Sequence, residues 1–267
     1  MTEGATHARA TASALHHFNR YEIKYLVDTS ALGRLREELA ARMVRDPHQS
    51  EPTRITSLYY DTRDLRFYWE KIDGLRFRRK LRVRAYGPPE TISDATRVYV
   101  EIKQRVNRVT QKRRVGLPYS HARLLCDARV DPGLAESAQP LVSEVLTLAH
   151  SIDLRPTAIT TYFRDGYVGR DADLGLRVTI DQRVSGRDRD FHLGASATNN
   201  FILPPNIAVV EMKANERVPA WFTDVAGKHD LSTVRVSKYC RAIEAYGRGV
   251  RAPQHAREAP DVMKEQE

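Results

Sequence analysis

Hydrophobic and polar residues alternate with a period of two in several stretches of this chain. This alternation, together with an abundance of Val, Ile, Tyr and Thr, predicts β-strands with one apolar face. The predicted strands cover residues 19–27, 53–61, 75–86, 97–105, 108–117, 157–169, 174–184 and 207–214. About eight strands of this kind favour a mainly β (α+β) fold, in which the strands close into an antiparallel barrel.

Apolar residues at helical spacing predict packing helices between and after the strands. The predicted helices cover 32–43, 134–150, 218–229 and 237–246. Ser30 is a potential N-cap of the first helix, Pro219 suits the first turn of the third, and Gly247 suits the end of the last. The stretch 188–200 is rich in Asp, Ser, Asn and Gly and should be a loop.

The 267 residues are expected to form one domain. Residues 1–15 and 248–267 are polar and lack periodicity, so we expect disordered tails on either side of a folded unit over 16–247. The chain lacks the run of roughly 18 apolar residues that a membrane helix needs, and its N-terminus lacks a secretory pattern. These features predict a soluble, cytoplasmic protein without a membrane segment.

Lys and Arg outnumber Asp and Glu by 43 to 34, which gives a net charge of +9. Such an excess favours an anionic partner, such as nucleic acid, phospholipid or a phosphorylated small molecule. Cys126 and Cys240 are too far apart in sequence to suggest a zinc site, and the nine histidines show no zinc-ligand spacing. Any bound metal would therefore rely on carboxylates.

The predicted strand 75–86 carries its positive charge on one face. Alternation places five basic residues on that face: Arg76, Arg78, Lys80, Arg82 and Arg84. Successive same-face positions lie about 6.6 Å apart, so these cations repel one another unless solvent or a polyanion compensates them. A solvated sheet face is one explanation, and a site for a polyanion is the other.

The same pattern recurs on other predicted strands. Same-face pairs are Glu101 with Lys103, Lys112 with Arg114, Tyr162 with Arg164, Arg177 with Asp181, and Glu211 with Lys213. If the strands close, these faces converge on a space whose low-dielectric walls focus the field onto an anion. The pattern therefore predicts a cation-lined tunnel for phosphates. The acidic residues Glu22, Glu101, Asp181 and Glu211 either pair with neighbouring cations or bind Mg²⁺ or Mn²⁺.

At this point the motifs resemble the VTC (vacuolar transporter chaperone) domain, a branch of the triphosphate tunnel metalloenzymes that also includes the CYTH enzymes. The resemblance extends from about Phe18 to Tyr246. The matching segments are Arg20–Val27, Ser57–Thr62, Lys80–Gly87, Val100–Lys103, Thr161–Arg164, Leu176–Asp181, Val210–Lys213 and Val236–Tyr239. No single motif is specific, but their order is.

The resemblance implies a polyphosphate polymerase. In that family an eight-stranded tunnel holds polyphosphate on basic side chains, a divalent metal (Mn²⁺ or Mg²⁺) sits on a glutamate, and ATP supplies its γ-phosphate to the growing chain. By position, the family's phosphate-binding cations match Lys24, Arg82, Arg84, Lys103, Arg164 and Lys238, with either Lys112 or Arg114 on the fifth strand. Tyr162 and Ser237 match residues lining the tunnel, and Glu211 matches the metal-binding acid.

Roles for these residues follow from the chemistry of phosphoryl transfer. The terminal phosphate oxygen is already ionised, so a catalytic base is not needed, and the main barrier is repulsion between anions. Arg82, Arg84, Arg164 and Lys238 are the residues expected to lower that barrier. The strand pattern adds Arg20, Arg177 and Lys213 as candidate phosphate-binding residues, and Glu22 and Glu101 as candidate metal ligands besides Glu211.

Two alternatives remain: a metal-dependent tri- or polyphosphate hydrolase on the same fold, and a non-catalytic polyanion-binding module. Hydrolytic CYTH relatives open with Glu-x-Glu-x-Lys, whereas Arg20 stands here where the first glutamate would be, before Glu22 and Lys24. This departure resembles the VTC branch and counts against triphosphatases and cyclases. A nucleic-acid partner is not expected, because the cations are not interleaved with exposed aromatic residues.

Overall fold

The computed structural model describes residues 20–47, 51–107, 109–215 and 217–249. The strands are β1 (Arg20–Asp28), β2 (Met43–Arg45), β3 (Thr53–Asp61), β4 (Phe77–Tyr86), β5 (Arg97–Val106), β6 (Val109–Pro118), β7 (Arg155–Gly169), β8 (Arg177–Arg187), β9 (Asn200–Phe201) and β10 (Ile207–Asn215). The helices are α1 (Leu32–Arg42), α2 (Arg66–Ile72), α3 (Tyr119–Cys126), α4 (Gln139–Ser151), α5 (Ala220–Lys228) and α6 (Lys238–Ala245). The tails predicted over 1–15 and 248–267 lie outside the described residues, apart from 248 and 249.

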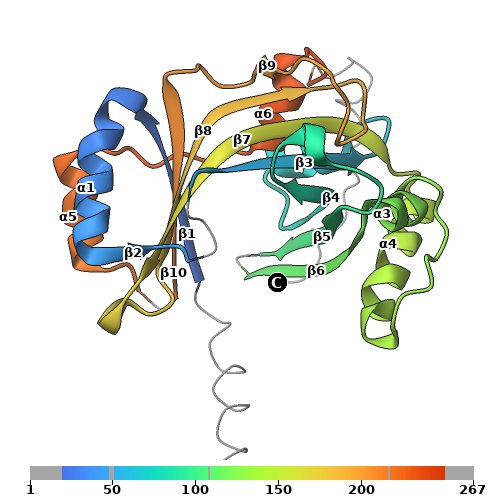
Figure 1. Cartoon of the computed structure of the whole chain (residues 1–267), viewed down its shortest axis with the longest axis horizontal. Coiled ribbons are helices and arrows are strands. Elements are labelled where there is room, and N and C mark those ends of the chain that lie inside the picture. Colours follow the sequence, from blue (N-terminus) through green and yellow to red (C-terminus); the bar gives the residue numbers. More distant parts are fainter. Residues whose placement is uncertain (1–19, 48–50, 108, 216, 250–267) are drawn as a thin grey trace, which may run out of the picture.

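The strands form one antiparallel sheet that curls into a half-barrel (Figure 1). Its order is β1-β10-β8-β7-β3-β4-β5-β6, with the short strands β2 and β9 added to β7 and β8. All eight predicted strands are present. The expectation of a closed barrel is too strong, however, because in the described residues no ladder joins β1 to β6. Most of β6 is exposed and carries Lys112, Arg113 and Arg114, a kind of charged edge that discourages further pairing.

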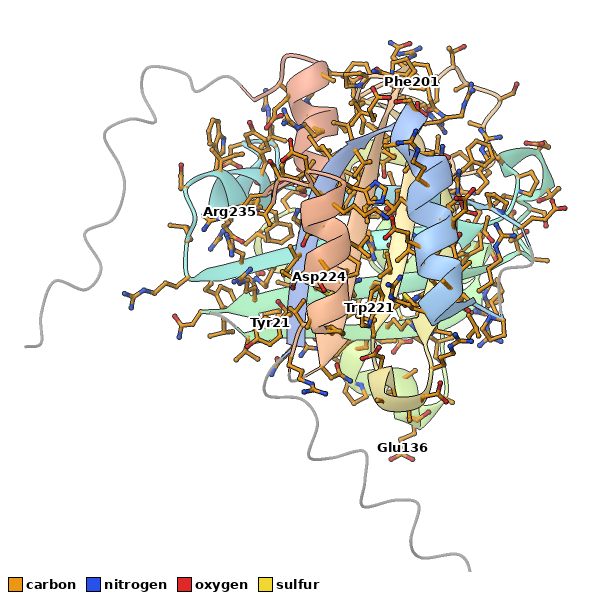
Figure 2. All side chains as sticks on the ribbon, turned by 90° about the vertical axis from the view of Figure 1, so that its left-hand side faces the viewer. Tyr21, Glu136, Phe201, Trp221, Asp224 and Arg235 are labelled. Carbon is orange, nitrogen blue, oxygen red and sulfur yellow. The ribbon has the colours of Figure 1, made fainter. Side chains whose placement is uncertain are left out.

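Helices cover the convex face of the sheet on two sides. On one side α3 and α4 pack against β4 and β5, where Leu81, Val83 and Val100 are buried. On the other side α1 and α5 pack against β8 and β10, and Figure 2 shows these two helices side by side. In both places the apolar face of the sheet points outward, toward the helices. The alternate residues of the same strands therefore face the concave side. This arrangement confirms that the charged faces share one interior.

The third packed cluster lies inside the curl of the sheet. There α6 packs through Tyr239 and Ile243 against Tyr59 of β3 and Tyr162 of β7. The helix begins after Ser237, whose hydroxyl accepts a hydrogen bond from the Cys240 backbone N–H. This terminal helix therefore brings its first residues to the concave face.

Some local predictions need correction. Ser30 does not cap α1, because a 3₁₀ turn over 29–31 intervenes and the Asp28 carboxylate accepts the Ser30 backbone N–H. Met43 begins β2 instead of ending the helix. The helices α2 and α3 were not predicted, since both are short and α2 follows a left-handed residue, Leu65, at φ 62°. Gly247 does follow the last helix, at φ 66°.

A buried carboxylate fixes the position of α2 relative to α6. Asp61, fully buried at the end of β3, accepts hydrogen bonds from the backbone N–H groups of Thr62, Phe67 and Tyr68, at 2.8, 2.8 and 3.0 Å. It also accepts a hydrogen bond from the hydroxyl of Tyr239 in α6. One side chain thus satisfies donors at the start of one helix and joins them to a second helix.

We predict that Asp61→Ala lowers the free energy of unfolding by about 3 kcal/mol or more, because several buried donors lose their acceptor together. The exposed neighbour Asp64 supplies the control, and Asp64→Ala should change stability by less than about 0.5 kcal/mol. Urea denaturation followed by circular dichroism measures both. Equal stability of the two variants would contradict the role assigned to Asp61.

Candidate functional site

The register of the strands places the predicted charges in rows across the concave face. Arg82 lies opposite Glu101, which lies opposite Arg114, and Lys103 lies between Lys80 and Lys112 in the next row. On the other half of the sheet, Lys213 lies between Arg177 and Glu22, and Glu211 lies between Thr179 and Lys24. The same-face arrangement predicted from alternation is therefore confirmed for these strands.

One group of charges surrounds Glu101 on β5. The Arg82 Nε donates to a Glu101 oxygen at 2.6 Å, and the Lys112 ammonium contacts the other oxygen. Burial would raise the pKa of Glu101, but Arg82, Arg84 and Lys112 outweigh it and lower the pKa to about 2. Burial also lowers the pKa of Lys112 to about 8, despite the contact with Glu101. The carboxylate is thus fully ionised and fixes two cations.

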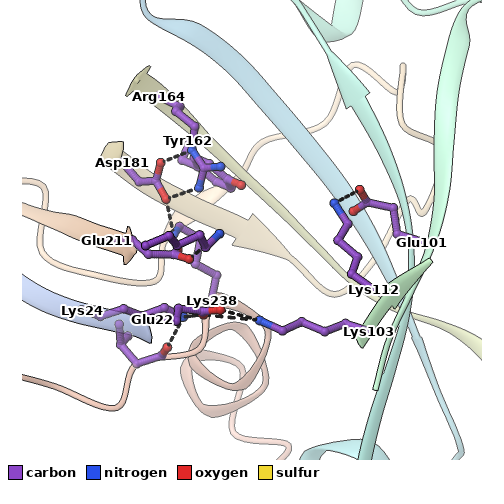
Figure 3. A network of polar contacts seen from close by, with 12 residues as sticks. Glu22, Lys24, Glu101, Lys103, Lys112, Tyr162, Arg164, Asp181, Glu211 and Lys238 are labelled. Atoms are coloured by element: carbon purple, nitrogen blue, oxygen red, sulfur yellow. Dashed lines mark hydrogen bonds and ion pairs between the residues drawn. The ribbon is translucent and has the colours of Figure 1, made fainter. Parts of the chain in front are cut away.

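A second group surrounds Asp181 on β8 (Figure 3). Arg164 donates to both of its oxygens, at 2.6 and 2.7 Å, and the Lys238 ammonium donates to one of them at 2.5 Å. The ring of Tyr162 lies 4.5 Å from the Lys238 ammonium and 5.2 Å from the Arg164 guanidinium, measured to its centroid. Burial opposes ionisation of Asp181, but the two cations outweigh it and lower the pKa to about 2.

A third group spans the opening of the half-barrel. Glu22 on β1 contacts Lys103 on β5 at 3.0 Å and Lys24 at 3.3 Å. Glu211 on β10 contacts Lys213 at 2.7 Å. Burial opposes the charge of Glu22, yet its pKa falls to about 2, with Lys103 contributing most of the attraction and Glu211 opposing it. Glu22 and Glu211 are therefore close enough to repel each other.

Several cations of the concave face contact no carboxylate within the described residues, among them Arg84, Lys80 and Arg114. Arg84 is buried and donates to Ser57 and to the Tyr162 hydroxyl, each at 3.1 Å. Lys80 donates to the Ser237 hydroxyl at 2.7 Å, and Arg114 lies 4.8 Å from the ring centroid of Tyr99. No carboxylate contacts these three side chains directly, so they can contact an anionic ligand without breaking an ion pair.

The structure does not bring every predicted residue into these groups. The guanidinium of Arg177 donates to Asp46, beyond β2, at 2.7 Å. The side chain of Arg20 lies outside what the structure describes. Glu101 belongs to a different group from Glu22 and Glu211, as Figure 3 shows. Both Lys112 and Arg114 face the concave side, so the open choice between them stays open.

Sequence reasoning missed two tyrosines beside the predicted cations. Tyr59 on β3 accepts a hydrogen bond from Arg82 at 3.2 Å, and its ring stacks on that of Tyr239 with 5.1 Å between centroids. Burial would raise the pKa of Tyr59, but Arg82, Arg84 and Lys80 lower it to about 7. The signal was present in the alternation of β3, which puts Tyr59 on the face of Ser57. Its neighbour Tyr239 lies on a helix and gave no such signal.

This arrangement suits a bound polyanion. The basic side chains of the concave face outnumber its carboxylates, and each carboxylate orients cations that phosphate oxygens could also contact. Within the described ranges, no group of three or more His, Cys, Asp or Glu residues is arranged to hold a metal ion. The helices of the same ranges are too short or too polar to cross a membrane.

The ion pairs predict a dependence of stability on pH. A carboxyl group whose pKa is lower in the folded than in the unfolded state stabilises the fold above its unfolded pKa, and this contribution is lost as pH falls. For Glu101, Glu22 and Asp181 the folded values are about 2, against ordinary values of 4.5, 4.5 and 3.8. The free energy of unfolding should therefore decrease between about pH 5 and pH 2.

Asp181→Asn should be less stable at pH 7 and show a shallower decrease toward pH 2 than the wild type. Asp171→Asn is the control, because the Asp171 side chain is 89% exposed. Urea denaturation at a series of pH values measures each slope. If the free energy of unfolding of Asp181→Asn fell with pH as steeply as that of the wild type, the ion pairs of Asp181 would not contribute to the pH dependence of stability.

Comparison with known proteins places the chain in a family. The model of the VTC domain matches residues 19–246. Among curated proteins, the chain is 26% identical over 226 residues to vacuolar transporter chaperone complex subunit 4 of Trypanosoma cruzi strain CL Brener, covering 72% of this chain and 28% of that protein. The same subunit of Trypanosoma brucei brucei is 26% identical over 220 residues, covering 71% and 28%. The chain thus matches little more than a quarter of the length of these relatives.

Among solved structures, a putative adenylate cyclase from Bacillus halodurans aligns with a TM-score of 0.49 at 15% identity, covering 82% of this chain and 96% of that one. A putative adenylate cyclase from Vibrio parahaemolyticus aligns with a TM-score of 0.42 at 11% identity, covering 82% and 94%. The family model covers most of the described fold, including all three groups of charges. The chain therefore belongs to the VTC domain family.

Proposed function

We propose that this chain is a polyphosphate polymerase that transfers the γ-phosphate of ATP to a growing chain of inorganic polyphosphate. The observation that carries the proposal is the concave face of a VTC domain on which buried carboxylates hold Arg82, Arg164 and Lys238 in fixed positions. Fixed cations suit a long, regularly charged anion better than a single small substrate, because they recur along several strands.

Catalysis in this proposal is electrostatic. The attacking group is a terminal phosphate oxygen, which is already ionised, and the barrier is the repulsion between two polyanions. Arg82, Arg84, Arg164 and Lys238 would hold both reactants in line and stabilise charge on the transferring phosphoryl group. Since Asp181 holds Arg164 and Lys238 before substrate arrives, little reorganisation is needed when the phosphates bind.

Of these four residues, Lys238 is the one that lies at the start of a helix. It is the first residue of α6, so the helix N-terminus adds partial positive charge and backbone N–H donors at the same point. The hydroxyl of Ser237, the N-cap residue, also accepts a hydrogen bond from the Lys80 ammonium of β4. This contact ties the start of the helix to the basic strand and directs positive charge from two elements to one place.

A divalent metal fits the carboxylates Glu211 and Glu22. Two hard oxygen ligands suit Mn²⁺ or Mg²⁺ when substrate phosphates supply the remaining ligands. The bound metal would neutralise charge on the donor phosphates. Lys213 and Lys24, which lower the pKa of Glu211 well below its usual range, keep this carboxylate ionised for such a role.

The two alternatives are a metal-dependent tri- or polyphosphate hydrolase and a non-catalytic polyanion-binding module. They differ in the fate of ATP. Incubation of the purified protein with ATP and Mn²⁺ should yield ADP and long polyphosphate in the proposed reaction. Inorganic phosphate without polymer would show a hydrolase, and unchanged ATP with bound polyphosphate would show a binding module.

Lys238→Leu should lose most polymer synthesis while retaining much of the affinity for polyphosphate, because the other cations of the concave face remain. Lys228→Leu provides a matched control, since Lys228 is 70% exposed and lies on α5. ADP release and polymer length are measured together with polyphosphate binding. Polymer synthesis by Lys238→Leu at the wild-type rate would remove Lys238 from the mechanism.

Glu211→Gln should raise the Mn²⁺ concentration needed for half-maximal activity by about tenfold or more, as expected for loss of a metal ligand. Glu101→Gln tests the other candidate ligand, and its smaller effect on the Mn²⁺ requirement would assign Glu101 to ion pairing. Activity is titrated with Mn²⁺ for each variant, and polyphosphate binding is measured in parallel. Full activity in excess chelator would contradict a metal at this position.

A further inference from the structure

A pocket on the convex face of the sheet lies apart from the concave face described above. It has a volume of about 780 Å³ and is lined by residues of β3, β7 and β8 and of the segment 197–201. Arg164 and Asp181 face the concave side. Phe163 and Gln182 are the preceding and following residues on the same strands, so their side chains point to the convex side. Gln182 also accepts a hydrogen bond from Arg36 of α1, which covers the convex face. The pocket therefore opens on the convex side of the sheet, and Tyr162, whose ring belongs to the concave face, also contributes to its lining.

The charge in this pocket is positive and uncompensated. Two arginines line it, Arg54 of β3 and Arg183 of β8, and none of the described lining residues is Asp or Glu. The Nε atom of Arg54 is buried and has no hydrogen-bond partner in the described part of the chain. A buried donor without an acceptor is unfavourable, so a ligand that supplies an acceptor would stabilise this arrangement.

Each arginine lies beside an exposed aromatic ring. The guanidinium of Arg54 is 5.8 Å from the ring centroid of Phe163, and that of Arg183 is also 5.8 Å from the ring centroid of Phe201. The two phenylalanines are 37% and 46% exposed, and Figure 2 shows Phe201 at the outer surface. Exposed apolar rings next to unpaired cations provide surface for a planar group beside an anionic one.

A backbone irregularity positions Arg183. The β7–β8 ladder shifts register between Thr161 and Phe163, so Arg183 and Val184 together oppose Tyr162. Arg183 adopts a left-handed conformation at φ 52°, which is unfavourable for a residue with a side chain. Bulges of this kind redirect a side chain and are frequent beside binding sites. Here the bulge brings Arg183 to Phe201 on the neighbouring β9.

From these observations we infer that the convex pocket binds a nucleoside phosphate, with the phosphate on Arg54 and Arg183 and the base against Phe163 and Phe201. Guanidinium groups match phosphate oxygens with two hydrogen bonds each, and aromatic rings stack on bases. The volume lies within the range of roughly 300–1,000 Å³ that is typical of small-molecule sites. This site is additional to the proposed transfer site and does not depend on it.

The test uses isothermal titration calorimetry of the whole chain with AMP, in the presence of saturating tripolyphosphate to occupy the concave face. AMP should bind with one site per chain, and adenosine and inorganic phosphate should each bind at least about tenfold more weakly, because each retains only half of the contacts. Failure of AMP to bind overturns the proposal. Equal binding of AMP and inorganic phosphate also overturns it, since the base would then contribute nothing.

Two sets of variants locate the binding. Arg54→Gln combined with Arg183→Gln, and separately Phe201→Ala, should each weaken AMP binding by about tenfold or more. Arg189→Gln, which changes an exposed arginine paired with Asp190, should not. Phe201 is exposed on a two-residue strand, so its variant tests the site even if the double variant fails to fold. Wild-type AMP affinity in Phe201→Ala would overturn the proposal.

Lys238→Leu separates this site from the proposed polymerase. AMP binding should be unchanged in Lys238→Leu if it occurs in the convex pocket, whatever reaction the concave face performs. Loss of AMP binding in that variant would assign the nucleotide to the concave face and overturn the proposal. Polymer synthesis by the wild type is measured separately, so a negative result there leaves the AMP measurement intact.

Discussion

Repulsion among the inward-facing cations is the constraint on which this structure depends. Basic side chains from several strands and a helix converge on one concave face, and each would destabilise the others if left uncompensated. Carboxylates resolve part of the conflict by contacting the cations around them: Glu101 and Asp181 each hold two, Glu22 bridges the opening, and Glu211 holds Lys213. The resulting face keeps an excess of positive charge, which suits a polyanion.

The apolar clusters follow from the same alternation. Because the charged residues of each strand face inward, the intervening Val, Leu and Ile residues face outward and require cover from helices. The pairs α1 with α5 and α3 with α4 supply that cover on two sides. The exception is α6, which enters the concave side on an aromatic cluster of Tyr59, Tyr162 and Tyr239. The rings of this cluster lie against Arg82, Lys80 and Lys238, so packing and charge are joined there.

The sequence allowed prediction of the faces but not of the partners. Alternation correctly placed Arg82, Glu101 and Lys112 on one side, because side-chain direction in a strand is a local property. The contact of Lys238 with Asp181 joins positions 57 residues apart on different elements, and only the tertiary fold brings them together. The same limit applies to closure of the barrel, to the Asp61–Tyr239 contact, and to the bulge at Arg183. The choice of metal ligand among Glu22, Glu101 and Glu211 could not be made from alternation, because all three share the inward face.

The open side of the sheet has a mechanical consequence. Within the main sheet, backbone hydrogen bonds join each strand to its neighbours in the order given above. Across the opening, β1 contacts β5 through the Glu22–Lys103 ion pair. The Glu22 side chain is 27% exposed and the Lys103 side chain 41%. Exposed ion pairs contribute only about 0–1 kcal/mol to stability. At this seam, side-chain contacts and not a ladder set the width of the half-barrel. If the proposed function is correct, a polyphosphate chain would be able to leave the concave face sideways through this seam, without being threaded by its end.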